Sequence, residues 1–246
     1  MSKSVEIMIN RHLPNLRGLH NYKRFPFFFL TIILVFHLSP VLSQKKTTLS
    51  IAVDPHISWF TSDNRDIETN GIKPGVSFGL VVDRFFGEKY AFSTGLFMTH
   101  LGGKLSYSDT VEIGTSIDTV TVATGTILSY SLQYISIPLA LKLKTVEIGY
   151  KTFFVELGLK AMIRINSKAS APNNLLVKDK ISDEIALFNL AYSFGGGMEY
   201  SLGENTSIIG GLYYTNTFLD ITKDLYDKPK DYLRASMLSL RVGVLF

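Results

Sequence analysis

Three residues of one short segment have the side chains of an acyl-transfer site. In DPHIS, Asp54, His56 and Ser58 occupy every second position. Together, serine, histidine and aspartate can supply a nucleophile, a general base and an orienting carboxylate. The spacing is typical of a β-strand, in which alternate side chains share a face but lie roughly 6–7 Å apart. That separation is too long for a direct serine–histidine hydrogen bond, so we expect no catalytic residues here. A lipid-modifying enzyme that uses His56 and Ser58 is kept as an alternative hypothesis.

Metal and phosphate sites have even less support. His100 is the only other histidine after residue 43, which argues against a histidine-rich metal site. The acidic runs at 62–68 and 220–231 could offer carboxylate oxygens to a divalent cation, but they lack the regular spacing of a calcium loop. FGGGMEY, at 194–200, lacks the Lys-Ser/Thr of a phosphate loop, and its glycines favour close strand approach. We therefore predict no cofactor-binding and no metal-binding residues.

Residues 1–43 have the pattern of a signal peptide that is removed on export. Basic residues precede the apolar run FPFFFLTIILVFHL at 25–38, and short side chains precede a cleavage position after Ser43. A membrane-spanning helix would need about 20 apolar residues, and this run is shorter. The long basic stretch leaves two translation starts open, Met1 and Met8.

Removal of this leader changes the charge of the chain. The leader holds five of the 25 Lys and Arg and one of the 21 Asp and Glu, so residues 44–246 carry 20 charges of each sign. A chain without net charge gives no support to nucleic-acid binding. The absence of cysteine excludes disulfides and thiol catalysis. The remaining residues, 44–246, suffice for one domain.

That domain is a succession of segments in which apolar and polar residues alternate, as in strands with one apolar face. In YISIPLALKLK, for example, every odd-numbered residue is Ile or Leu. Two of the segments are less regular but rich in aromatic and β-branched residues. Eight strands are predicted: 49–60, 76–83, 90–101, 134–144, 153–164, 188–202, 205–218 and the terminal MLSLRVGVLF.

Short and long connections alternate between these strands. The short ones are 87–89, 145–149 and 203–205; the long ones are roughly 61–72, 102–126, 166–184 and 219–232. This wiring is typical of an all-β, eight-stranded, antiparallel up-and-down transmembrane β-barrel, with short periplasmic turns and long extracellular loops. The alternating Thr- and Val-rich link at 102–126 predicts a hairpin that extends its two strands above the membrane.

Aromatic residues cluster near the predicted strand ends, as expected at a lipid–water boundary. The inner rim is predicted to hold Phe85, Phe86, Tyr90, Tyr150 and Tyr200. The outer rim is predicted to hold Trp59, Phe60, Tyr130, Phe188 and Phe218. The last strand, which ends at Phe246, would pair with the first to close the barrel. It also resembles the signal that the outer-membrane assembly machinery reads, which makes that machinery an expected partner.

The opposite face of the strands carries both signs of charge. An eight-stranded barrel is just wide enough for its side chains to fill the lumen, and an unpaired buried charge is costly. We therefore predict a lumen network of ion pairs and no diffusion pore. The lumen residues are predicted to be Asp54, His56, Asp83, Lys142, Lys144, Glu156, Lys160, Arg164, Glu199 and Arg241.

Three segments resemble one known family. YISIPLALKLK, FGGGMEY and LSLRVGVLF resemble the PorT-like outer-membrane β-barrel family of Gram-negative bacteria, over about 47–246. The resemblance implies an outer-membrane barrel in contact with lipid, and the namesake's part in type IX protein secretion implies secretion-system proteins as partners. It offers no catalytic residues to transfer. We expect a monomeric, non-enzymatic barrel with an accessory or structural role. The alternative is a surface-binding or adhesion protein that acts through the loops 102–126 and 166–184.

Overall fold

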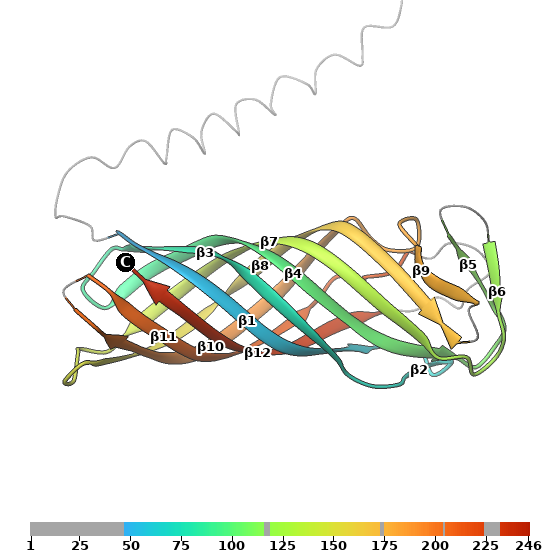
Figure 1. Ribbon diagram of the computed structural model, residues 1–246, viewed down its shortest axis with the longest axis horizontal. Coiled ribbons are helices and arrows are strands. Elements are labelled where there is room, and N and C mark those ends of the chain that lie inside the picture. The colour runs from blue at the N-terminus through green and yellow to red at the C-terminus, as the bar shows by residue number, and fades with distance from the viewer. Residues whose placement is uncertain (1–46, 116–118, 173–174, 204, 224–231) are drawn as a thin grey trace, which may run out of the picture. The chain divides into compact units, whose positions relative to one another are not determined.

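The computed structural model describes residues 47–115, 119–172, 175–203, 205–223 and 232–246 (Figure 1). The predicted signal peptide, 1–43, lies outside the described residues, as does most of the acidic run at 220–231. Within the described residues, no helix has the length and apolar character needed to cross a membrane.

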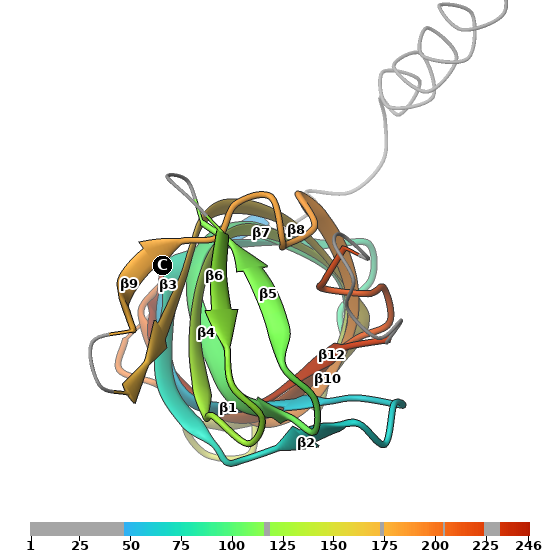
Figure 2. The same ribbon diagram turned by 90° about the vertical axis from the view of Figure 1, so that its right-hand side faces the viewer.

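Eight long antiparallel strands form a closed barrel (Figures 1 and 2). Each strand pairs with its neighbour along the chain, and the last pairs with the first. The predicted eight-stranded barrel is thereby confirmed. The barrel strands are β1 (Thr47–Thr61), β3 (Lys73–Phe85), β4 (Tyr90–Tyr107), β7 (Leu128–Lys144), β8 (Lys151–Ala171), β10 (Phe188–Ser201), β11 (Ser207–Thr217) and β12 (Arg234–Leu245).

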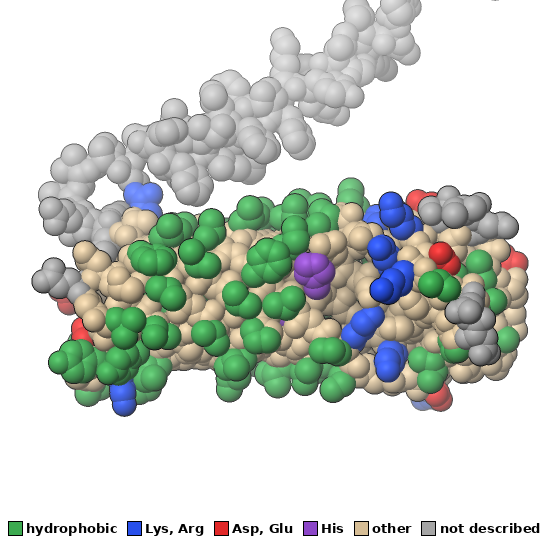
Figure 3. Space-filling view, in the orientation of Figure 1, with side chains coloured by type: hydrophobic (Ala, Val, Ile, Leu, Met, Phe, Trp, Pro, Cys, Tyr) green, Lys and Arg blue, Asp and Glu red, His purple; other side chains and the backbone are tan. Residues whose placement is uncertain are grey.

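The seam between β1 and β12 is hydrogen-bonded to its end. The Leu49 N–H donates to Phe246 O over 3.2 Å, and the Phe246 N–H donates to Leu49 O over 2.7 Å. Side chains alternate strictly along β1 between exposed and buried. The exposed face is apolar on every barrel strand, and Figure 3 shows such side chains spread over much of one side of the barrel. A closed sheet with an apolar outer face is the arrangement that lipid can solvate.

Most of the aromatic residues predicted for the rims do lie on the outer face. Phe86 and Tyr90 stack with ring centroids 6.1 Å apart, and Tyr150 and Tyr200 form a second pair at 6.2 Å. The prediction is wrong for Phe60, Phe85 and Tyr130, whose side chains are buried. Each of the three stands at the inward-facing phase of its strand, and this phase outweighs the preference of an aromatic ring for the boundary.

The strands extend well past the membrane at the end with the long connections. β8 has 21 residues and β4 has 18, whereas about 9–11 suffice to span a bilayer. Four short strands are added there: β2 (Ile67–Thr69) pairs with β4, β9 (Leu176–Lys180) pairs with β8, and β5 (Val111–Gly114) pairs with β6 (Thr119–Val122). The predicted extension of the 102–126 link is confirmed in part, because β4 and β7 do lengthen but β5 and β6 form a separate sheet.

The apolar core lies at this long-loop end. It joins inward-facing side chains of the barrel to side chains of the loops above them. Its largest fully buried members are Phe60, Leu105, Ile113, Leu128, Leu132, Tyr134, Met162, Leu176, Ile181, Ile185, Ile221 and Leu233.

Candidate functional site: a filled lumen beneath a loop cap

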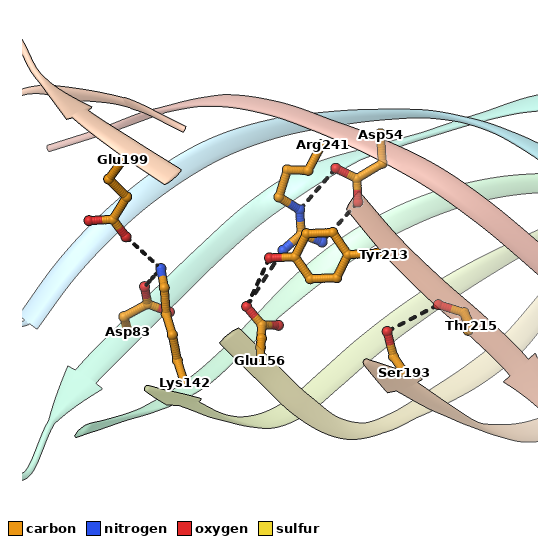
Figure 4. Close-up of polar contacts among 9 residues, drawn as sticks. All are labelled: Asp54, Asp83, Lys142, Glu156, Ser193, Glu199, Tyr213, Thr215 and Arg241. Carbon is orange, nitrogen blue, oxygen red and sulfur yellow. Dashed lines mark hydrogen bonds and ion pairs between the residues drawn. The ribbon is translucent and has the colours of Figure 1, made fainter. Parts of the chain in front are cut away.

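The lumen near the short turns is occupied by an ion cluster centred on Lys142. Its Nζ lies 2.7 Å from Asp83 Oδ2 and 2.9 Å from Glu199 Oε1 (Figure 4). Lys144 pairs with the other oxygen of Glu199. Lys142, Asp83 and Glu199 are each at most 5% exposed, so little solvent screens these attractions. Three strands, β3, β7 and β10, are tied across the lumen at this level.

A second cluster centres on Arg241. Its Nε and Nη2 donate to the two carboxylate oxygens of Asp54 over 3.0 and 2.8 Å, which is the bidentate geometry (Figure 4). Nη1 lies 3.9 Å from Glu156 Oε2, to which the Tyr213 hydroxyl donates over 3.1 Å. The guanidinium also lies 4.0 Å from the centre of the Tyr213 ring. Positive charge is thus enclosed by two carboxylates and an aromatic face.

These contacts confirm the predicted pairing of lumen charges. Of the remaining predicted lumen residues, His56 is buried, Lys160 lies in register with buried Ala191, and the Arg164 Nη1 donates to Ser167 Oγ over 2.9 Å. The paired charges occupy the lumen at this level, where a diffusion pore would hold water.

Apolar side chains fill the lumen above the ion clusters, and sequence reasoning missed them. Phe60 and Tyr130 pack edge to face with centroids 6.0 Å apart, and the Tyr107 and Tyr130 hydroxyls are 3.2 Å apart. Tyr134 and Met162 are at most 1% exposed. The sequence did contain an indication of this. In LSYSLQY, residues 128–134, the apolar side chains occupy even-numbered positions, which are the positions that face inward in the predicted strand 134–144.

The loops above this level form a cap, defined as β2, β5, β6, β9 and residues 123–127, 172, 175, 181–187, 219–223 and 232–233. Figure 2, viewed from the long-loop end, shows β5 and β6 lying across the opening of the barrel. Ile113 of β5 is fully buried in the shared core. The Gly114 N–H donates to the buried Glu184 Oε1 over 2.9 Å, and the Ala186 N–H donates to Ile221 O over 2.8 Å. The cap is therefore packed into the barrel and cross-linked by hydrogen bonds.

The structure does not bring His56 and Ser58 together as a catalytic pair. The His56 ring nitrogens lie within hydrogen-bond distance of backbone oxygens, Nδ1 at 3.1 Å from Asp54 O and Nε2 at 3.0 Å from His100 O. The Ser58 Oγ donates to Gly102 O over 2.7 Å and accepts from the Gly102 N–H over 3.0 Å. The carboxylate of Asp54 binds Arg241 instead of the imidazole. All three side chains are thus bound to groups on other strands, Asp54 to β12 and His56 and Ser58 to β4.

Replacing Ser58 by Ala is expected to lower the free energy of unfolding by about 1–3 kcal/mol, because the Gly102 N–H would lose its buried acceptor. Urea unfolding of the barrel in lipid vesicles measures this loss. We also expect the mass spectrum of lipid A from cells that carry the variant to equal that of the wild type. A change in lipid mass, with the barrel folded, would instead assign chemistry to this residue.

No metal-ligand group is formed within the described part of the chain: no three His, Cys, Asp or Glu side chains converge there. FGGGMEY lies in β10, as its pattern predicted. A Cβ on Gly197 would collide with Gly210 O and Gly211 Cα of β11. These glycines therefore permit close approach of two strands, in agreement with the sequence-based interpretation.

Comparison with known families agrees with the barrel. Residues 43–184, more than half of the chain, match the family model for the outer membrane protein beta-barrel domain. The chain belongs to this family. It is accordingly an outer-membrane β-barrel protein, and by the wiring of such barrels the long-loop end and its cap are extracellular.

The barrel is similar to several solved outer-membrane proteins. Ail, the attachment invasion locus protein of Yersinia pestis, is 12% identical, with a TM-score of 0.40 and coverage of 82% of this chain and 99% of Ail. OprG from Pseudomonas aeruginosa is also 12% identical, with a TM-score of 0.40 and coverage of 84% and 99%. Neisserial surface protein A is likewise 12% identical, with a TM-score of 0.40 and coverage of 80% of this chain and 96% of that protein. No curated protein matches the sequence.

Proposed function

We propose that this protein is a non-enzymatic barrel with an accessory or structural role at the cell surface, exercised through contact between its cap and another surface protein. The observation that carries this proposal is the combination of a filled lumen with a cap anchored in the apolar core. A lumen occupied by ion pairs and aromatic rings does not favour transport of solutes. The cap, at the extracellular end of the barrel, is accessible from outside the cell.

A pocket in the cap supports contact with a protein. Its volume is about 450 Å³, and it lies between the segment that follows β6 and the segment that follows β8. Nearby, Val177 of β9 is 63% exposed. Exposed apolar groups above the level of the lipid are typical of protein contact sites. The pocket is lined by Ala123, Gly125, Thr126, Ile127, Pro172 and Leu175.

The finer proposal is a part in the export of surface proteins. It rests on the resemblance of YISIPLALKLK, FGGGMEY and LSLRVGVLF to PorT-like barrels. A protein that assists export must touch other proteins at the rims or loops of the barrel, and the cap offers such a surface. The second candidate is adhesion. In this case the same exposed apolar groups of the cap would contact a surface outside the cell.

Deletion of the gene is expected to reduce surface-exposed and secreted proteins and to leave cargo in the periplasm, as measured by comparative proteomics of both fractions. Restoring the wild-type gene should cure the defect. A variant with Ile127→Asp and Leu175→Asp should fail to do so, because two charges would line the pocket.

Ile148→Asp is the control, since Ile148 is also exposed but lies in a short turn at the opposite end of the barrel. It should restore export fully. A deletion strain with an unchanged surface proteome would refute the export role. A loss of attachment to surfaces in that same strain would favour adhesion.

A further inference from the structure

A row of basic side chains borders the lipid-facing surface at its extracellular edge. Figure 3 shows Lys and Arg side chains in a line between the apolar surface and the long-loop end. We call this row the cationic strip. On the outer face of β3, β4, β8 and β9 it comprises Lys73, Lys104, Lys168, Lys178 and Lys180.

Strand register brings the strip together. Lys104 of β4 is paired with Ser129 of β7, and Ser131 of β7 is paired with Lys168 of β8. Lys168 is in turn paired with Lys180 of β9. Neighbouring strands lie about 4.8 Å apart, so these positions form one continuous line across four strands.

Lys73 reaches the same line from a more distant strand. Its Nζ donates to Ser131 Oγ over 2.6 Å, to Ser129 Oγ over 3.1 Å and to Tyr130 O over 3.1 Å. The lysine stem passes over Gly102, where a Cβ would lie 2.8 Å from Lys73 Cδ. Burial first, and then the charges of Lys104 and Lys178, lower the pKa of Lys73 below that of an ordinary lysine. Lys73, Lys104 and Lys178 are thus close enough for their charges to interact.

The strip lacks neutralising carboxylates within the described part of the chain. The ion pairs formed there join lumen residues, and none of them includes a strip lysine. Neighbouring like charges repel one another, and a bound anion would relieve this repulsion. In contrast to the charges of the lumen clusters, the strip lysines form no ion pair with a carboxylate of the described residues.

The level of the strip indicates where that anion comes from. Directly below it on the outer face, Ile163 and Ile165 of β8 are 44% and 45% exposed, and Ile135 of β7 continues this apolar surface. Acyl chains that cover these residues place their headgroups beside Lys168 and Ser131. We propose that the cationic strip binds the phosphate groups of lipid in the outer leaflet.

The test uses the full barrel, refolded in zwitterionic detergent and titrated with diphosphorylated lipid A, with bound lipid counted by native mass spectrometry. Wild-type protein should retain this lipid. The triple variant K104Q, K168Q and K180Q should bind it on the order of a hundredfold more weakly, roughly fivefold for each charge lost. Dephosphorylated lipid A, which keeps its acyl chains, should bind wild type as weakly as diphosphorylated lipid A binds the variant.

The matched control removes three exposed cations at the opposite rim, with R84Q, K89Q and K151Q, and should leave binding unchanged. Lys→Arg at the three strip positions should also retain binding, and heat-modified gel mobility reports whether each variant is folded. K168Q alone, expected to lose roughly fivefold, serves if the triple variant does not fold. Equal losses in strip and control variants would overturn the proposal. So would equal binding of dephosphorylated lipid A, or full competition by millimolar inorganic phosphate.

Discussion

Replacing Arg241 by Met is expected to lower the free energy of unfolding by about 3–5 kcal/mol. The guanidinium is the partner of Asp54 through two hydrogen bonds and lies 3.9 Å from Glu156. Its removal leaves the buried Asp54 carboxylate without its bidentate partner, and Lys160 acts on Asp54 and Glu156 through its charge alone. Urea unfolding in lipid vesicles, followed by fluorescence of Trp59, the single tryptophan, measures the loss.

Arg84→Met is the matched control. Arg84 is exposed on the outer face near a short turn, so its loss should change the free energy of unfolding by less than about 1 kcal/mol. The double variant Asp54→Leu with Arg241→Met should recover much of the stability, because removing both partners leaves no unpaired charge between them. Equal effects of Arg241→Met and Arg84→Met would contradict the assigned role of the cluster.

Replacing Ile113 by Asp is expected to detach the hairpin of β5 and β6 from the barrel. Ile113 is fully buried in the apolar core, and a carboxylate there would have no partner of opposite charge in that core. The lost packing and the buried charge together cost about 3 kcal/mol or more. Protease cleavage within residues 109–125 should then accelerate on the order of a hundredfold. The barrel itself should keep its heat-modified gel mobility.

Thr121→Asp provides the comparison on the same hairpin. Thr121 is exposed on β6 opposite Glu112, so the new charge remains in water, where salt screens its repulsion with Glu112, and cleavage should stay near the wild-type rate. If Ile113→Asp left the cleavage rate unchanged, the hairpin would not be held by the apolar core. If it abolished folding of the barrel, the cap would be part of the folding unit of the strands.

The sequence was sufficient to predict the barrel because the alternation of apolar and polar residues determines which side chains face the lipid and which face the lumen. Every second residue of a strand faces the same side, so Ile137 and Leu139 were assigned to lipid and Lys142 to the lumen from their positions alone. The partners inside the lumen could not be predicted in the same way. Whether Lys142 meets Asp83 or Asp54 depends on the stagger of strands around the barrel, which no single segment encodes.

The cationic strip shows a second limit. Continuing the alternation of β8 from Ile163 would place Lys168 in the lumen. A register shift between Gln133 and Tyr134 of β7, opposite Asn166 and Arg164, reverses the phase and turns Lys168 outward. One extra residue in a strand exchanges its inward-facing and outward-facing positions, and the local composition does not indicate where the extra residue lies. The prediction of the aromatic rims was wrong for the opposite reason. Phe60 and Tyr130 follow the alternation of their strands and face inward, although their aromatic character led us to expect them at the lipid boundary.

The seam between β1 and β12 has a kinetic consequence. Asp54 and Arg241 stand on its two sides and are separated by 187 positions along the chain. Contacts between such distant positions form late, because the chain between them must first be ordered. Until the ends meet, an inserted but open sheet holds a cation and a carboxylate apart, each in surroundings of low polarity. Because reopening would separate two buried charges, we expect the pair to slow the reopening of a completed barrel.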